Sequence, residues 1–401
     1  MIEFDPDMRK TDFSAVNIKI IGIGGAGGNT VNSMIESGLS NVEFIVANSD
    51  LQALRNSKAS CKIQLGMKTT KGLGCGANPD LGRRATEEDL EKIMENLDHA
   101  DIVFIVAGMG GGTGSGGAPV VAKALKDRGI LSIAVVTKPF LFEGKRRMLV
   151  AEHALEDLKK DIDTLIVVPN EKLLGLVDRS VSMVASFNMI NELLIHSVKS
   201  ISSIISKSGH INVDFADLSA IMKGMGLAMM GTGSASGENR ASQAAMRAIS
   251  SPLLENMDIK SAKGVLLNIS GGPSLSLHEI SDAANVIYDL SDKNAHIILG
   301  TVIDEDLKDD IVVSVVATGF QPAVQVSQTI QAVTPPKKDS LFLAEQDPIL
   351  QQAVRESRSQ EVLQKVSRED VQRSDTHDID ELDVPAFLRK QSKADMKFED
   401  L

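Results

Sequence analysis

The stretch Gly110-Gly111-Gly112-Thr113-Gly114-Ser115-Gly116 follows the apolar run Ile102–Val106 and precedes a helical pattern at residues 118–125. Glycine leaves its main-chain N–H group accessible because it has no Cβ, and it accepts positive φ angles. A strand that enters such a loop and leaves it through a helix directs several N–H groups and a helix N-terminus at one point. The stretch therefore predicts an anion site that suits a di- or triphosphate. A flexible linker, the alternative, would not separate a buried strand from an amphipathic helix.

A second glycine loop, Gly22-Ile23-Gly24-Gly25-Ala26-Gly27-Gly28-Asn29, follows an earlier strand pattern. Its first, third and sixth residues have the spacing of the dinucleotide fingerprint, which keeps an NAD-dependent oxidoreductase of Rossmann type as an alternative. The later loop favours a mononucleotide with a long phosphate tail, because a dinucleotide fold has no use for it. A third segment, Gly72–Pro79, adds small residues at the same predicted edge. The sequence contains no P-loop pattern, so main-chain amides and a metal ion are expected to hold the phosphates.

Apolar runs alternate with helical patterns along the first half of the chain. The expected strands are Ile18–Ile23, Val42–Ala47, Ile102–Ala107, Ser132–Val136 and Leu165–Val168. Helical patterns such as Pro79–Leu97 and Lys145–Leu158 lie between them. This alternation predicts an α/β fold with a doubly wound, mostly parallel sheet and a ligand at the carboxyl ends of its strands.

A long helical pattern spans residues 180–208, and Gly209 is a natural stop. The patterns behind it predict a smaller α/β domain with strands at Val265–Ile269, Ile297–Val302 and Ile311–Val316 and helices at Ala241–Ile249 and His278–Leu290. The expected boundaries are a flexible N-terminus at 1–12, a nucleotide-binding domain at 13–179, a central helix at 180–209 and a C-terminal domain at 210–320. A disordered linker at 321–380 and a C-terminal segment at 381–401 complete the chain, because the composition after Gln321 cannot bury a core.

The overall composition limits the partners. With 54 acidic and 42 basic residues, the net charge of −12 argues against a nucleic-acid or anionic-membrane surface. Two cysteines give no disulfide framework or metal spacing. We expect a cytoplasmic protein without direct membrane insertion, since no apolar run approaches the roughly 20 residues that span a bilayer.

An acidic segment, Asn212-Val213-Asp214-Phe215-Ala216-Asp217, follows the long helical pattern. Asp214 suits a helix N-cap and Asp217 the third helical position, which is the purely structural interpretation. Two carboxylates and an amide could also orient a water for attack on phosphate. If Phe187 and Asn191 contact the base, the long helix puts Asp214 roughly 30 Å away, so that Asp214 reaches only a nucleotide held by a neighbour stacked head to tail.

Four motifs in this order resemble those of the FtsZ family of bacterial tubulin-like cell-division GTPases: Gly24–Asn29, Gly110–Gly116, Phe140–Arg147 and Asn212–Asp217. The similarity runs from about Ile18 to Gly319. The tail cluster Asp383–Gln391 resembles the family's adaptor-binding peptide. The resemblance implies GTP and GDP as ligands, Mg²⁺ without a dedicated protein cage, and head-to-tail protofilaments that form the division ring at midcell. It also implies membrane-tethering adaptors and division regulators as partners.

The resemblance carries specific roles to this sequence. It implies nucleotide contacts from the residues Gly25, Ala26, Gly27, Gly28, Asn29, Gly112, Thr113, Gly114, Glu143, Arg147, Phe187 and Asn191. Glu143 and Arg147 would meet the ribose and phosphates, although an i,i+4 pair is also typical of a solvated helix surface. Asn212, Asp214 and Asp217 would complete hydrolysis on the adjacent subunit.

This sequence departs from the family pattern at four positions. Cys75 stands where alanine is typical, Leu141 where a polar residue is usual, and Asn191 and Ala185 where the family often has Asp. A tubulin-like partner that binds GTP without hydrolysing it is a third interpretation, against which Asp214 and Asp217 both count.

Overall fold

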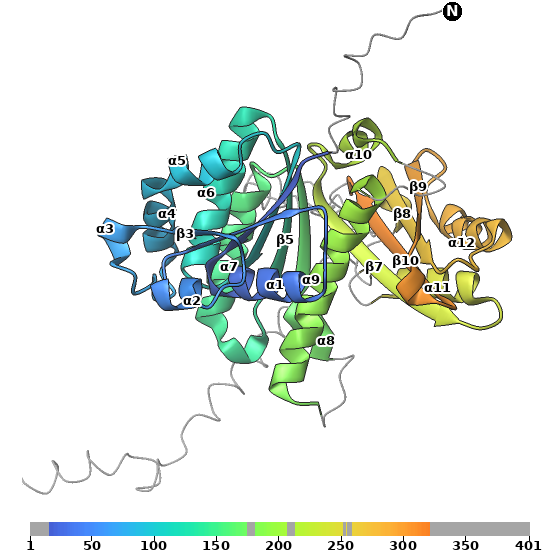
Figure 1. Ribbon diagram of the computed structural model, residues 1–401, viewed down its shortest axis with the longest axis horizontal. Coiled ribbons are helices and arrows are strands. Elements are labelled where there is room, and N and C mark those ends of the chain that lie inside the picture. Colours follow the sequence, from blue (N-terminus) through green and yellow to red (C-terminus); the bar gives the residue numbers. More distant parts are fainter. Residues whose placement is uncertain (1–15, 175–180, 207–212, 252–253, 255–258, 321–401) are drawn as a thin grey trace, which may run out of the picture. The chain divides into compact units, whose positions relative to one another are not determined.

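The computed structural model describes residues 16–174, 181–206, 213–251, 254 and 259–320. Within them, ten strands form one sheet in the order β3-β2-β1-β4-β5-β6-β7-β10-β8-β9 (Figure 1). The expectations for the N-terminus 1–12, the linker 321–380, the C-terminal segment 381–401 with Asp383–Gln391, and Asn212 lie outside the described residues.

The first six strands are parallel, and all of them except β3 agree closely with the sequence patterns. They are β1 (Ile18–Ile23), β2 (Glu43–Asn48), β3 (Cys61–Gln64), β4 (Ile102–Gly108), β5 (Leu131–Lys138) and β6 (Thr164–Pro169). Strand β1 pairs with both β2 and β4, so the strand order reverses between β1 and β4. Ligands of such sheets bind beyond the carboxyl ends of the strands at this reversal.

Helices cover both faces of the parallel strands. The helices of this part are α1 (Gly24–Glu36), α2 (Leu51–Arg55), α3 (Met67–Thr70), α4 (Pro79–Glu88), α5 (Leu90–Asn96), α6 (Thr113–Arg128), α7 (Lys145–Lys159) and α8 (Asn170–Leu174). Alternate residues of β4 enter different cores, Phe104 one and Ile105 the other. The strands are therefore buried on both faces, which explains their nearly continuous apolar sequences.

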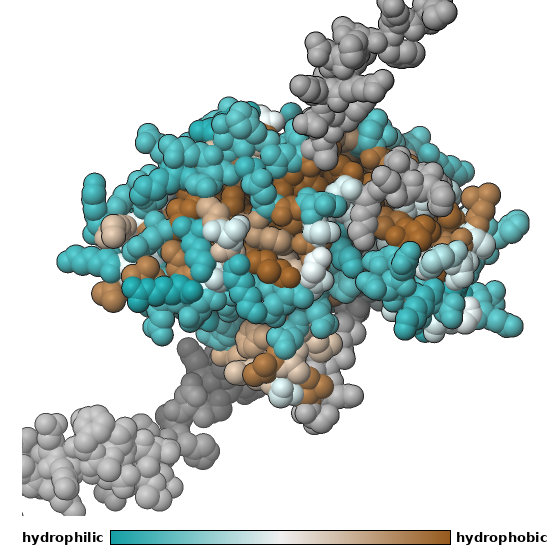
Figure 2. Space-filling model, in the orientation of Figure 1, coloured by the Kyte–Doolittle hydropathy of each residue, from teal (hydrophilic) through white to brown (hydrophobic). Residues whose placement is uncertain are grey.

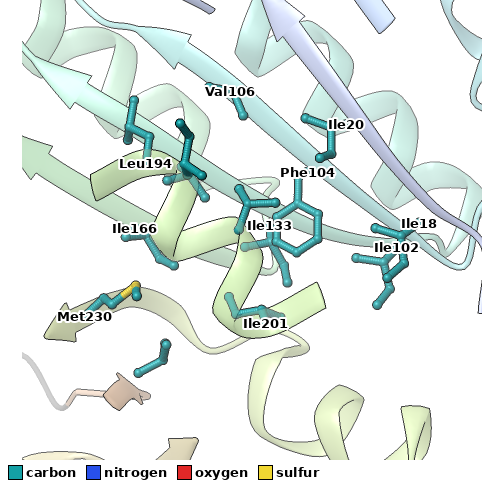
Figure 3. Packing of buried hydrophobic residues seen from close by; sticks show 14 of the residues in the cluster. Ile18, Ile20, Ile102, Phe104, Val106, Ile133, Ile166, Leu194, Ile201 and Met230 are labelled. Carbon is teal, nitrogen blue, oxygen red and sulfur yellow. The ribbon is translucent and has the colours of Figure 1, made fainter. Parts of the chain in front are cut away.

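The long helix α9 (Met183–Ser206) joins the two halves of the described structure. Leu194 and Ile201 of this helix share a core cluster with Phe104 and Ile133 of the parallel strands (Figure 3). Residues Leu266, Ile298 and Val316 of the second half belong to the same cluster. The predicted long central helix is confirmed, and one apolar core runs along it.

The second half continues the sheet beyond β6. Its strands are β7 (Gly226–Ser236), β8 (Gly264–Gly271), β9 (His296–Ile303) and β10 (Asp310–Thr318), and its helices are α10 (Phe215–Met222), α11 (Arg240–Ile249) and α12 (Leu277–Leu290). Only the three pairs from Thr164–Gly226 to Ile166–Ala228 connect β6 to β7. Strand β10 is antiparallel to both of its neighbours, while β8 and β9 are parallel. The predicted mostly parallel α/β architecture with a smaller second α/β region is confirmed.

Two strands have no counterpart among the sequence patterns. Strand β7 has glycines in place of a continuous apolar run, because α11 packs directly on its main chain: a Cβ on Gly231 would lie 2.0 Å from the Ala248 carbonyl oxygen. Strand β3 is short and lies at the edge of the sheet. The expected helix Pro79–Leu97 is interrupted at Asp89, whose buried carboxylate accepts a hydrogen bond from Gly66 N at 2.8 Å.

No helix in the described part of the chain is long and apolar enough to cross a bilayer.

An ion pair between Arg240 and Glu279 connects α11 to the first turn of α12. Arg240 Nε lies 2.6 Å from Glu279 Oε1, and Glu279 also closes a capping box with Ser276. Hydrogen bonding from Arg240 lowers the pKa of Glu279 from 4.5 to about 2. The stabilisation is therefore complete above pH 4.5 and is lost as the pH falls toward 2.

We expect Glu279→Gln to lower the free energy of unfolding at pH 7 by about 1–2 kcal/mol, because the charged Arg240 then bonds to a neutral amide in place of a carboxylate. Urea unfolding at several pH values measures the effect. The gap between wild type and variant should narrow as the pH falls below about 4.5, whereas the exposed Glu238→Gln control should show no gap. A gap that is the same at pH 7 and pH 3 would contradict the assigned role.

Candidate nucleotide-binding site

Two helix N-termini meet at the reversal of strand order. Helix α1 begins directly behind β1, and α6 begins behind β4, the parallel neighbour of β1. In the described structure neither helix has a side-chain cap at its N-terminus or an acidic residue in its first turn. By contrast, Asn78, Asp214 and Ser276 cap helices elsewhere. The free N–H groups and partial positive charges of α1 and α6 thus make a site for an anion.

Close main-chain contacts between the glycine loops hold these two helix ends together. A Cβ on Gly27 would lie 2.3 Å from the Val106 carbonyl oxygen of β4, and one on Gly24 would lie 3.0 Å from Gly114 N. Gly24 also has φ +75°. Side chains at these positions would separate the loops, so the glycines are required by packing as well as by ligand access.

A cavity of about 530 Å³ opens at this point, a size typical of cofactor sites. Ten of the twelve predicted nucleotide contacts line it: Gly25, Ala26, Asn29, Gly112, Thr113, Gly114, Glu143, Arg147, Phe187 and Asn191. Gly27 and Gly28 lie instead in the contact between α1 and the sheet, at Val106 and Val46. The segment Gly72–Pro79 packs on Gly112 through Cys75 and Asn78. The structure therefore brings together residues from three of the four motifs and from the long helix α9.

The end of the cavity opposite the glycine loops is formed by α9. Phe187 packs edge-on against Phe140 at a centroid distance of 5.7 Å and is 39% exposed, so that its ring can pack against a planar base. Asn191 Oδ1 accepts a hydrogen bond from Thr30 Oγ1 at 3.1 Å. The amide of Asn191 therefore also fixes α9 against α1.

Glu143 and Arg147 form an ion pair at the mouth of the cavity. Glu143 is mostly buried and accepts a hydrogen bond from Phe140 N at 2.9 Å, which shapes the turn between β5 and α7. Arg147 is half exposed. The pair differs from a freely solvated helix pair, because Glu143 is anchored and holds a cation beside the predicted phosphate end.

The cavity lining also includes ten residues that were not predicted to contact the nucleotide. They are Ile23, Thr30, Gly108, Met109, Gly111, Thr137, Pro139, Asn170, Ile190 and Leu194. Thr137, Pro139 and Asn170 lie at or just beyond the carboxyl ends of β5 and β6, and Ile190 and Leu194 lie about one helical turn from Phe187 and Asn191. The position of Thr137, Pro139 and Asn170 at the end of a strand could therefore have indicated them, although their residue types did not.

Asn170 carries an unusual polar atom. Its side chain is 6% exposed, and Oδ1 finds no hydrogen-bond partner among the described residues. A buried, unpaired acceptor is unfavourable by about 1–3 kcal/mol. A ligand hydroxyl or N–H in this cavity would satisfy it, so the orphaned oxygen fits a bound nucleotide.

We expect Asn170→Ala to weaken nucleotide binding about five- to tenfold, because the ligand loses one hydrogen-bond acceptor. The melting temperature of the nucleotide-free protein should change little, since the lost oxygen has no partner to leave behind. Calorimetric titration with GDP and thermal melting measure the two effects. The exposed Asn294→Ala is the control, and equal affinity of Asn170→Ala and wild type would contradict the contact.

The acidic segment lies away from this cavity. Asp214 caps α10 and accepts a hydrogen bond from Asp217 N at 2.7 Å, and both side chains are exposed. The 24 residues of α9 span about 36 Å between the Phe187 end and the α10 end (Figure 1). Among the described residues, no group of three or more His, Cys, Asp or Glu could hold a metal ion. Mg²⁺ therefore stays a prediction, to be bound together with phosphates.

Comparison with known proteins agrees with a nucleotide-binding α/β protein of tubulin type. The GTPase domain of the Tubulin/FtsZ family matches residues 17–178, and the FtsZ family C-terminal domain matches residues 226–321. The cell division protein FtsZ of Pseudomonas aeruginosa is 46% identical over 387 residues, 94% of this chain and 96% of that protein. The chain belongs to the FtsZ family of tubulin-like GTPases.

Solved structures give the same fold. An empty FtsZ dimer from M. jannaschii is 42% identical with a TM-score of 0.74, over 79% of this chain and 93% of that one. CetZ2 from Haloferax volcanii, solved as a GTPγS-bound protofilament, shares the fold with 24% identity and a TM-score of 0.66 over 78% and 96% of the two chains. The resemblance to the family is confirmed, and the oxidoreductase alternative finds no support.

Proposed function

We propose that this GTPase polymerises head to tail and hydrolyses GTP only where two copies meet. The observation that carries the proposal is the separation within one chain of the cavity from Asp214 and Asp217 by the length of α9. A chain that holds the nucleotide at one end and the acidic residues at the other needs a neighbour to complete its reaction site. Such a contact is heterologous and propagates as a filament unless it closes into a ring.

The phosphates would lie at the N-termini of α1 and α6, with Gly25, Gly112 and Thr113 donating hydrogen bonds. Phe187 and Asn191 would contact guanine, and Arg147 would balance charge near the ribose and phosphates. Asn212, Asp214 and Asp217 of the next copy would orient the attacking water and accept its proton. Bound Mg²⁺ supplies further neutralisation of phosphate charge.

The surface around the cavity is suited to a second copy. Leu141 and Phe142 beside the turn before α7, and Met183 and Val184 at the start of α9, are exposed. The surface around the start of α9 is coloured as apolar in Figure 2. Apolar side chains that gather beside a ligand site are typical of a protein interface. They support burial of this end of the molecule in a filament.

Asp214→Asn separates catalysis from helix capping, because Asn caps α10 as well as Asp but lacks the negative charge. We expect this variant to bind GTP and form pelletable filaments while phosphate release falls at least about 100-fold, the scale of a lost general base. The exposed Asp282→Asn is the matched control. Normal turnover of GTP by Asp214→Asn would contradict a shared site.

The specific activity of the wild-type protein should rise with protein concentration. Activity per molecule that stays constant on dilution would also contradict a shared site.

The residues Asp383–Gln391 would bind membrane-tethering adaptors, and the protein would act in the cytoplasm in a division ring at midcell with division regulators. This part of the proposal is supported by the tail sequence, an apolar and basic cluster within polar surroundings.

Removal of residues 383–401 should leave GTP-dependent pelleting and phosphate release within about twofold of wild type, because the cavity and α10 remain intact. Co-sedimentation with a purified adaptor should be lost. Failure of the truncated chain to polymerise would show that the segment serves assembly instead.

A further inference from the structure

Three buried side chains from three separate loops form a hydrogen-bonded row beneath the nucleotide cavity. Ser49 follows β2, Cys75 lies in the third glycine segment, and Thr113 is the first residue of α6. Cys75 Sγ donates to Ser49 Oγ at 3.2 Å, and Ser49 Oγ lies 2.6 Å from Thr113 Oγ1. The residues are 0%, 5% and 8% exposed for Ser49, Cys75 and Thr113, so water does not compete for these bonds.

The sequence of donors and acceptors along the row determines whether the Thr113 hydroxyl proton is free to bond to another acceptor. A hydroxyl has one proton to donate and two lone pairs that accept. Either hydroxyl of the Ser49–Thr113 pair could donate at this distance. Because the Cys75 thiol donates to Ser49 and the described residues offer Ser49 Oγ no third partner, the arrangement that leaves no buried Ser49 proton unpaired is the one in which Ser49 donates to Thr113 Oγ1. The Thr113 hydroxyl then has its own proton available for a further acceptor, and Thr113 lines the cavity. Successive hydrogen bonds of this kind polarise and strengthen one another.

The main chain holds Ser49 in place from the same side. Its carbonyl oxygen accepts hydrogen bonds from Gly74 N at 3.2 Å and from Thr70 Oγ1 at 3.4 Å. A Cβ on Gly112 would meet Cys75 Cβ at 2.7 Å, so the third segment presses directly on the loop that begins α6. This segment does not line the cavity, and fixing Ser49 gives it a function.

We propose that Ser49 is a positioning residue, which, supported by Cys75, orients the Thr113 hydroxyl to donate to a phosphate oxygen of the bound nucleotide. The inference rests on the proposed function of the cavity. It assigns no contact between Ser49 and the nucleotide, since Ser49 acts through Thr113.

A double-mutant cycle for nucleotide affinity tests the coupling. Ser49→Ala and Thr113→Ala should each weaken GDP binding about five- to tenfold, the scale of one hydrogen bond, measured by calorimetry on full-length protein without GTP. Adding Ser49→Ala to Thr113→Ala should cause no further loss. Ser49→Thr keeps the hydroxyl and should bind within about twofold of wild type. Ser57→Ala removes a buried serine hydroxyl bonded to Asn32, remote from the row, and should leave affinity unchanged.

Equal losses from Ser49→Ala in the wild-type and Thr113→Ala backgrounds would overturn the proposal, as would a loss from Ser57→Ala of the same size. If Ser49→Ala does not fold, Cys75→Ala replaces it, with an expected two- to threefold loss that disappears in the Thr113→Ala background. A loss that persists there would again overturn the coupling. Absence of GDP binding by the unmodified protein would overturn the proposed function of the cavity. This result differs from additive losses of GDP affinity in the double-mutant cycle, which would overturn only the coupling between Ser49 and Thr113.

Discussion

The structure depends on the direct main-chain contact between the loops that follow β1 and β4. Gly27 approaches the Val106 carbonyl group of β4 so closely that no side chain fits between them, and Gly24 lies against the main chain of Gly114. This approach places the free N-termini of α1 and α6 side by side, and the anion site follows from it. Arg147, Phe187 and Asn170 line the same cavity, in which the partial positive charges of the two helix N-termini favour an anion.

A second constraint is the rigid distance along α9. The helix packs on both halves of the sheet and so transmits a fixed spacing between the cavity and the acidic start of α10. A single chain cannot shorten this spacing without unfolding the helix. In the proposed filament, the contact that adds a copy is also the contact that completes the reaction site.

The sequence was sufficient to predict those parts of the fold in which a single physical requirement determines the residue types. Strands β1, β4 and β5 are buried on both faces and are mostly apolar, and the glycine loops need close approach, so the strands and the loops were predicted. Strand β7 was missed because packing against α11 requires glycine at Gly231 and Gly233, which interrupts its apolar pattern. Asn170 and Ser49 were missed because a single polar residue behind a strand has many uses, and only the fold reveals its partners.

The junction between β6 and β7 has a consequence for the stability of the molecule. Only three residue pairs join the strands there, while β7 pairs with β10 over nine. Few main-chain hydrogen bonds thus cross the junction, and side chains of α9 pack against both halves of the sheet. Amide protons near the junction are expected to exchange with solvent earlier than those of β4, since local opening begins where the fewest hydrogen bonds join neighbouring strands.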